Sequence, residues 1–342
     1  MIFRRFLTVI STLAAATVLS AAAASKPTRP TGAADGAYKG AIVVEMVTGN
    51  VLFEDRGDFV SPPASMTKLM TFAVLHDKIA SGALTLDTPV TVTAADSKIG
   101  GTQVWLKEKE IFPVEELIYA MIIQSANDAS FALARTAAGS VPAFVELMNA
   151  KAAELGMTNT TFRTPHGLPP ANRKIAEGDL TTPRDFALLS RYLLQKTNIL
   201  KYSAIETRDF GPPVRDAAVK MDTHNNLLGH VAGVDGLKTG FTAGAGYCLA
   251  ATAQRNGRRL IVVTMGSPAS RTRDLKVTEL IERGFANLPS VPAIPAISTN
   301  ADSGSSPITA APPPPKTPAA TTPTPASETP PPIRVNIPRA KK

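Results

Sequence analysis

Residues 61–75 read Ser-Pro-Pro-Ala-Ser-Met-Thr-Lys-Leu-Met-Thr-Phe-Ala-Val-Leu, a proline pair followed by an apolar run. The pattern predicts a helix that begins near Ser65 and ends at Ser81-Gly82. Residues three positions apart share a helix face, so Lys68 would lie over Ser65. A serine at a helix N-terminus also meets unpaired backbone N–H groups and a dipole that favours developing negative charge. A hydroxyl, a nearby base and support for an oxyanion together predict an activated nucleophile.

Ser65 and Lys68 do not establish such a site alone. A lysine acts as a base only if burial or a second cation lowers its pKa. Serine and lysine are also common residues, so the same spacing occurs on ordinary surface helices. Both interpretations stay open until the remainder of the chain is considered.

The N-terminus carries a targeting pattern. Arg4 and Arg5 precede an apolar stretch from residue 6 to 19, and Ala22-Ala23-Ala24 follows with small side chains. This order predicts a Sec-type signal peptide over residues 1–24, cleaved after Ala24. An uncleaved anchor is the alternative, because the apolar run is almost long enough to span a bilayer. Export would place the protein in the periplasm or on the wall side of the cytoplasmic membrane.

Composition divides the rest of the chain into three parts. Residues 25–38 form a small-residue leader that we expect to be flexible. Residues 39–286 contain enough apolar side chains to form the hydrophobic core of one domain. Cys248 is the only cysteine, so no intramolecular disulfide can stabilise that domain. Residues 287–342 hold fifteen of the 29 prolines and predict an extended, disordered tail. That tail has no apolar helical face, so we expect no stable membrane-docking helix.

The net charge of +8 is less informative than its size suggests. Two of these charges belong to Arg4 and Arg5, and three belong to the tail. The remaining surface is mildly basic without a basic stripe that alternates with aromatic residues, which argues against nucleic acid as a partner. The histidines show no ligand spacing, so neither a metal nor another cofactor is expected.

Strands and helices are both expected in the body. The residues flanking Thr48-Gly49 predict a hairpin, and three later apolar stretches predict adjacent strands. These strand ranges are 41–46, 50–53, 233–238, 247–253 and 260–265, with Gly257 as the last turn. The helical ranges are 114–124, 129–138, 141–155, 185–194 (capped by Thr182 and Pro183) and 275–285. Strands at both ends and helices between them predict an α+β fold with a mostly antiparallel sheet.

Two short motifs follow the Ser65 segment. Ser125-Ala126-Asn127 separates two predicted apolar helices, and Lys238-Thr239-Gly240 lies at the end of a predicted strand. Taken singly, Ser125 is equally well explained as a helix cap and Lys238 as a solvated lysine. In this order, however, the three motifs resemble the penicillin-recognising serine hydrolases.

Longer strings make the resemblance more specific. Residues 123–129, 156–162, 166–168 and 235–240 are similar to the D-alanyl-D-alanine carboxypeptidase family of low-molecular-weight penicillin-binding proteins. The resemblance covers residues 39–286. It implies a β-lactamase/transpeptidase-like fold, an antiparallel sheet flanked by helices with an all-helical subdomain.

The resemblance also implies catalytic roles. Ser65 would be the acylated nucleophile, Lys68 its general base, and Ser125 a proton relay to the departing D-alanine. Lys238 would keep Lys68 partly deprotonated and help Thr239 to bind the terminal carboxylate.

Further residues are implied as substrate contacts. Asn127 would hold a substrate amide, and the backbone N–H groups of Ser65 and Phe241 would form the oxyanion hole. Gly240 would let the backbone approach the substrate. Arg271 matches a family arginine near the carboxylate, with an ordinary solvated arginine as the alternative.

The implied reaction removes the terminal D-alanine from peptidoglycan stem pentapeptides, and β-lactam antibiotics would acylate the same serine. A D,D-endopeptidase that cleaves cross-links would use identical motifs. A β-lactamase is disfavoured because the loop with Glu177 and Asp179 lacks an E-x-x-L-N pattern, and an inactive wall-binding scaffold is disfavoured by the intact motifs. His166 is interpreted as loop scaffolding. The third stem-peptide residue and the oligomeric state stay open.

Overall fold

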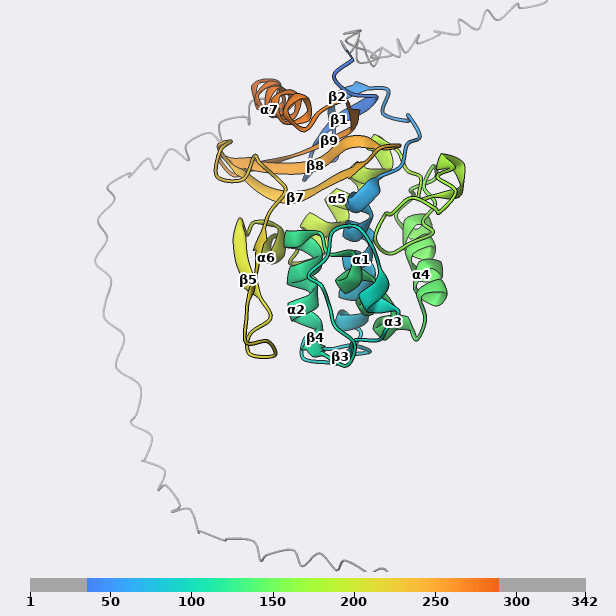
Figure 1. Cartoon of the computed structure of the whole chain (residues 1–342). Coiled ribbons are helices and arrows are strands. Elements are labelled where there is room, and N and C mark those ends of the chain that lie inside the picture. The colour runs from blue at the N-terminus through green and yellow to red at the C-terminus, as the bar shows by residue number, and fades with distance from the viewer. Residues whose placement is uncertain (1–35, 289–342) are drawn as a thin grey trace, which may run out of the picture. The chain divides into compact units, whose positions relative to one another are not determined.

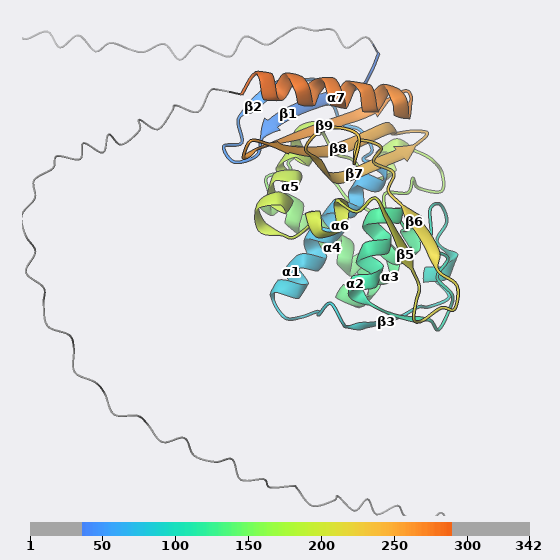
Figure 2. The ribbon, with the colours of Figure 1, turned by 90° about the vertical axis from the view of Figure 1, so that its left-hand side faces the viewer.

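A computed structural model describes residues 36–288 of the chain. The predicted signal peptide, most of the leader and nearly all of the proline-rich tail lie outside the described residues. Within the described range, a five-stranded sheet lies between α7 (Ser270–Ala286) on one face and several helices on the other (Figures 1 and 2). This arrangement confirms the predicted α+β class.

The sheet has the strand order β2-β1-β9-β8-β7, and every neighbouring pair is antiparallel. Its strands are β1 (Gly40–Glu45), β2 (Val51–Asp55), β7 (Val234–Thr242), β8 (Gly246–Arg255) and β9 (Arg258–Ser267). The predicted first hairpin and the three adjacent late strands are therefore confirmed. β7 forms one edge of the sheet, so one side of its backbone has no strand partner among residues 36–288.

The sheet is buried on both faces. In β1, Ala41 and Val43 belong to the core beneath α7, whereas Ile42 and Val44 belong to the core shared with the other helices. This alternation follows from the two-residue side-chain period of a strand. On the helical side, α5 (Pro183–Lys196) begins as predicted: Thr182 accepts a hydrogen bond from the Asp185 amide at 3.1 Å, and Pro183 occupies the first turn.

The remaining helices lie on the face of the sheet opposite α7 (Figures 1 and 2). They are α1 (Lys68–Ala80), α2 (Val114–Tyr119), α3 (Asn127–Ala138), α4 (Val141–Glu154) and α6 (Leu200–Ser203). Short 3-10 turns cover Ala64–Thr67, Asp96–Lys98 and Ile175–Glu177. The helix expected over 114–124 ends instead in a π-helical turn, Ala120–Gln124, directly before Ser125. Among residues 36–288, no helix is both long and apolar enough to cross a membrane.

Two small sheets accompany these helices, which corrects the all-helical subdomain that the family resemblance implied. β3 (Pro89–Thr91) pairs with β4 (Ile111–Pro113), and β5 (Thr207–Phe210) pairs with β6 (Val219–Asp222) (Figure 1). Strands of three or four residues are too short to show a periodic pattern. Their partners also lie many residues away, so only the folded chain reveals them.

Candidate active site

Ser65 lies in the 3-10 turn that leads into α1. Its Oγ is 3.1 Å from the Nζ atom of Lys68, the first residue of the α-helix. The one-turn spacing thus brings the hydroxyl and the amine together, as the sequence predicts. Ala64, directly before the serine, has a left-handed φ of 50°, a conformation that stores strain in an L-residue and is common at functional sites.

The Lys68 amine is buried among neutral acceptors. Besides the Ser65 hydroxyl, its Nζ donates to Asn127 Oδ1 at 2.7 Å and to the His166 carbonyl at 2.8 Å. The Lys68 side chain is fully buried. Three neutral acceptors can hold an amine in place without stabilising its charge as a carboxylate would.

The electrostatics favour the neutral form of Lys68. Burial is the largest cause that lowers the pKa of Lys68 well below that of a free lysine, and the charge of Lys238 is the next. Asp179 and Asp128 oppose this shift without cancelling it. Burial, followed by the charge of Arg273, lowers the pKa of Lys238 to about 7. The site therefore contains an amine, Lys68, whose neutral and basic form is favoured far more than in a free lysine.

Two glycines fix the backbone of the serine. A Cβ atom on Gly167 would lie 1.9 Å from the Ala64 carbonyl oxygen, and one on Gly240 would lie 2.5 Å from the Pro63 carbonyl oxygen. Only glycine allows three chain segments to approach so closely. Their packing holds the Ser65 amide between the loop that contains Gly167 and the edge strand β7.

The π-helical turn before Ser125 changes the direction of the chain. Ser125 adopts a left-handed φ of 66°, and α3 then begins at Asn127. The Asn127 amide N–H donates to the Thr102 carbonyl at 2.8 Å, and its side-chain Nδ2 donates to the Gly100 carbonyl at 2.9 Å. Asn127, which we expected to hold a substrate amide, therefore anchors Lys68 and the 100–102 loop in this structure.

A cavity of about 300 Å³ opens over these groups. Five of the predicted site residues line it: Ser65, Ser125, Thr239, Gly240 and Phe241. Six residues that the sequence did not single out for this role complete the wall: Thr102, His224, Asn226, Tyr247, Ser270 and Arg273. Lys68, Asn127 and Lys238 are buried behind this lining.

The arginine of the cavity is Arg273 and not Arg271. Arg271 is exposed and does not line the cavity, whereas Arg273 is buried and does. Arg273 begins the inner stripe of α7, which continues through Val277 and Leu280 at helical spacing. This periodicity was visible in the sequence and would have distinguished the two arginines. The expectation for Arg271 is corrected accordingly.

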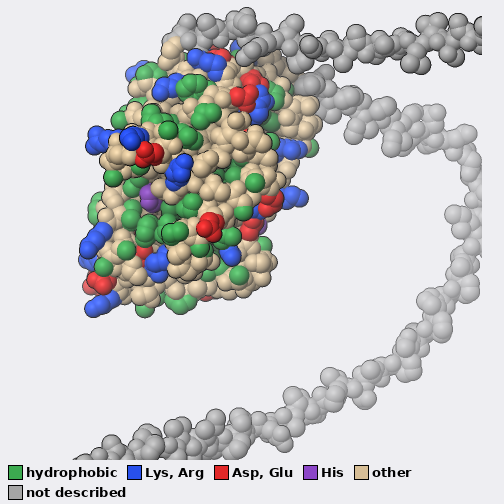
Figure 3. Space-filling model, turned by 90° about the vertical axis from the view of Figure 1, so that its right-hand side faces the viewer, with side chains coloured by type: hydrophobic (Ala, Val, Ile, Leu, Met, Phe, Trp, Pro, Cys, Tyr) green, Lys and Arg blue, Asp and Glu red, His purple; other side chains and the backbone are tan. Residues whose placement is uncertain are grey.

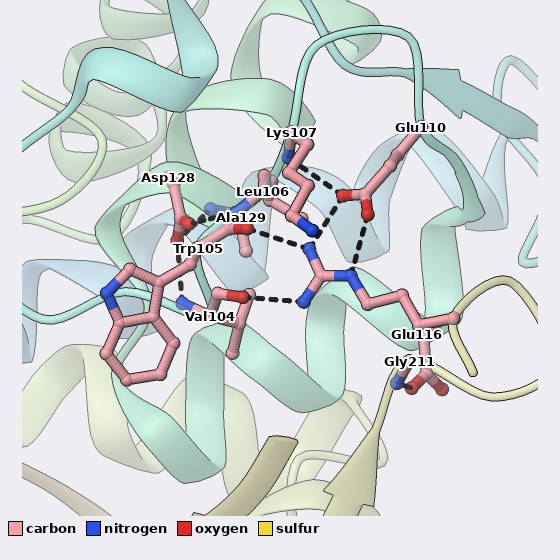
Figure 4. A network of polar contacts seen from close by, with 10 residues as sticks. Val104, Trp105, Leu106, Lys107, Glu110, Glu116, Asp128, Ala129 and Gly211 are labelled. Carbon is pink, nitrogen blue, oxygen red and sulfur yellow. Dashed lines mark hydrogen bonds and ion pairs between the residues drawn. The ribbon is translucent and has the colours of Figure 1, made fainter. Parts of the chain in front are cut away.

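A second polar network fixes the loop that borders the cavity (Figure 4). The buried Asp128 carboxylate accepts a hydrogen bond from the Leu106 amide at 3.0 Å. From the other side, the Arg215 guanidinium donates to the Trp105 carbonyl at 2.8 Å and pairs with Glu110 at 2.6 Å. Trp105 is 60% exposed and has a left-handed φ of 53°, so the loop conformation depends on this network.

His166 serves the site through its backbone. Its carbonyl accepts from Lys68, and its ring Nδ1 accepts from the Leu168 amide at 3.1 Å. Burial, followed by the charge of Lys68, lowers the pKa of the ring to about 3, so the ring is neutral. In the part of the chain from 36 to 288, no cluster of His, Cys, Asp or Glu could hold a metal ion.

Comparison with known proteins identifies the family of this chain. The model of the D-alanyl-D-alanine carboxypeptidase family of peptidases matches residues 24–269, most of the chain. The chain belongs to this family.

Relatives within the family are similar over the same region. D-alanyl-D-alanine carboxypeptidase DacF of Bacillus subtilis is 34% identical over 72% of this chain and 62% of its own length. DacC of Escherichia coli is 37% identical over 71% of this chain and 60% of its own. The chain thus spans about 60% of the length of these curated relatives.

Solved structures of the family share the fold. The D-alanyl-D-alanine carboxypeptidase DacD from Francisella tularensis gives a TM-score of 0.70 with 27% identity, over 75% of this chain and 71% of that one. Penicillin-Binding Protein D2 from Listeria monocytogenes, in its ampicillin-bound form, gives 0.65 with 30% identity, over 73% of this chain and 97% of that one. The predicted transpeptidase-like fold is confirmed.

Proposed function

We propose that this protein is a serine-type D-Ala-D-Ala carboxypeptidase that removes the terminal D-alanine from peptidoglycan stem pentapeptides. The observation that carries the proposal is the buried Lys68 amine, 3.1 Å from the Ser65 hydroxyl and bonded only to neutral acceptors. Membership of the family supports the same reaction.

In the first step, neutral Lys68 accepts the Ser65 proton while Oγ attacks the carbonyl carbon of the D-Ala–D-Ala peptide bond. Negative charge develops on the carbonyl oxygen, which the backbone N–H groups of Ser65 and Phe241 stabilise. The packing of Gly167 and Gly240 on the serine segment supports this role, because it sets the position of one of these donors.

The tetrahedral intermediate then releases D-alanine. The nitrogen of the departing residue receives the proton from Lys68 through Ser125, which lines the same cavity as Ser65. The C–N bond breaks and the acyl chain stays on Ser65 as an ester. A water molecule attacks this ester, Lys68 takes its proton, and Ser65 regains a proton as the shortened peptide leaves as a carboxylate.

Binding of the terminal carboxylate positions the substrate so that its last peptide bond lies at Ser65. Thr239 and Arg273 both line the cavity, and the Lys238 side chain next to Thr239 is buried. Arginine is suited to a carboxylate because its guanidinium presents paired donors. We therefore assign Arg273, instead of Arg271, to carboxylate binding in this proposal.

A D,D-endopeptidase remains the second candidate, because the same groups would cleave a cross-link. β-Lactam antibiotics would acylate Ser65 in either case. The predicted signal peptide supports action on the wall side of the cytoplasmic membrane.

Incubation with a fluorescent penicillin, and separately with a pentapeptide ending in D-Ala-D-Ala, tests the proposal. We expect covalent labelling and release of free D-alanine by the natural sequence, and loss of both in Ser65→Ala. Circular dichroism checks that the substitution of the half-buried Ser65 leaves the fold intact. Labelling of Ser65→Ala would contradict the nucleophile assignment, and labelling of the natural sequence without D-alanine release would favour the endopeptidase.

A further inference from the structure

A second cavity adjoins the proposed active site. It measures about 280 Å³, far more than a single water needs, and it is mainly apolar. Leu168, Pro170 and Ile175 form its loop wall, and Thr242 and Gly244 form its sheet wall. None of these residues has a role in the reaction proposed above.

The second cavity continues the line of the substrate along β7. The carboxylate end of the substrate is assigned to Thr239, and its reacting carbonyl to the Phe241 amide. The acyl part must therefore extend beyond Phe241, and the next residues of the chain, Thr242–Gly244, are the wall of the second cavity. The loop wall also lies close to the serine, because Gly167 packs against the Ala64–Ser65 backbone.

The mouth of this cavity has an uncompensated positive charge. Lys174 is paired with Glu177 at 3.2 Å, but within residues 36–288 the neighbouring Arg173 guanidinium makes no hydrogen bond or ion pair. The acidic lining residue Asp179 is buried and already accepts from Thr67 at 2.9 Å and from two backbone amides. Figure 3 views the side on which α4 and this loop lie, where basic side chains stand among apolar ones.

We propose that the second cavity binds the side chain of the residue preceding D-Ala-D-Ala, and that Arg173 selects a side chain ending in a carboxylate. The apolar walls would contact its methylene groups and the guanidinium would pair with its charged end. The inference rests on the proposed function and specifies its substrate. It assigns the third stem-peptide residue to the dicarboxylic class instead of the lysine class.

Three tripeptides test this selection, each with an N-acetylated first residue followed by D-Ala-D-Ala. The first residue is 2-aminoadipate, norleucine or lysine, so that a straight side chain ends in a carboxylate, a methyl group or an amine. Release of D-alanine gives kcat/KM for each peptide. We expect the carboxylate peptide to exceed the methyl peptide by about tenfold, the effect of one charge-assisted hydrogen bond at a partly exposed site.

Substitution of Arg173 gives the decisive comparison. In Arg173→Gln the ratio between the carboxylate and methyl peptides should fall close to one, and in Arg173→Glu the amine peptide should become the best substrate. Lys196→Gln is the matched control, because it removes an exposed positive charge that lines neither cavity and should keep the ratio.

The outcomes separate this inference from the function on which it rests. Hydrolysis of all three peptides with equal kcat/KM, or a preference for the amine in the natural sequence, would overturn the selection by Arg173 and leave the carboxypeptidase standing. A carboxylate preference that survives in Arg173→Gln would overturn it as well. Failure to hydrolyse any of the three peptides would overturn the proposed function together with the inference.

Discussion

Replacement of Gly167 by alanine should damage both the fold and acylation, because its α-carbon lies against the backbone of the proposed nucleophile. The new Cβ would lie 1.9 Å from the Ala64 carbonyl oxygen, about 1.5 Å closer than ordinary van der Waals contact allows. The residue also has a φ of +85°, which costs alanine about 1–2 kcal/mol. Relieving the overlap by moving backbone adds about 1–3 kcal/mol. We therefore expect Gly167→Ala to lower the free energy of unfolding by about 2–5 kcal/mol.

The same displacement should slow acylation of Ser65. Any movement of Ala64 shifts the Ser65 amide, which the mechanism uses as an oxyanion donor. Loss of one such donor typically reduces the rate by about 100-fold or more. Urea unfolding measures the loss in the free energy of unfolding. Stopped-flow fluorescence with a labelled penicillin measures the acylation rate constant of the protein that remains folded.

Gly156→Ala is the matched control for Gly167→Ala. Gly156 also has a positive φ, +74°, but a Cβ there meets nothing within 4 Å. This variant should therefore lose about 1–2 kcal/mol from backbone strain alone and keep the natural acylation rate. The reasoning is refuted if Gly167→Ala matches Gly156→Ala in both stability and acylation, since close packing would then have no influence on the nucleophile.

Two charge changes should move the pH dependence of acylation in opposite directions. The rate rises as Lys68 loses its proton, so the acid limb follows the Lys68 pKa. Lys238→Gln removes a charge that lowers this pKa, and its limb should move to higher pH by about one unit or more. Asp128→Asn removes a charge that raises the Lys68 pKa, so the acid limb of this variant should move to lower pH. The variant should also lose about 1–3 kcal/mol of stability, because the Leu106 amide loses its buried acceptor. Rate profiles between pH 5 and 9 measure both limbs, and shifts in the same direction would contradict the electrostatic account.

The sequence predicted those parts of the site that depend on local geometry. The contact between Ser65 and Lys68 follows from one helical turn, and the apolar runs after residue 233 are long enough to identify three strands. The packing of Gly240 against the serine segment joins residues far apart in the chain, and no local pattern contains it. The proximity of Lys238 and Lys68 was therefore predicted from the family motifs, because no periodic pattern in the sequence indicates it.

The remaining walls of the cavity could not be inferred in this way. His224 and Asn226 follow the short strand β6, and their position depends on a chain path without periodic signal. Arg273 is different, because its spacing to Val277 marks the buried face of α7 and excludes Arg271. The buried position of Arg273 thus follows from a periodic pattern in the sequence, whereas the positions of His224 and Asn226 follow only from the folded structure.

The charge arrangement also explains why the site is costly to fold and useful for catalysis. Lys68 and Lys238 are buried without a carboxylate partner in hydrogen-bond contact in the described range, while Asp128 and Asp179 are bonded to amides and hydroxyls. A Lys238 pKa near 7 means that the native state binds fewer protons than the unfolded state between about pH 7 and 10, so stability rises with pH there. Burial of the Lys238 amine therefore costs stability at and below neutral pH, where the unfolded chain keeps this lysine fully charged. A substrate carboxylate near Lys238 would favour the charged form of the amine, so Lys238 would take up a proton as the substrate binds.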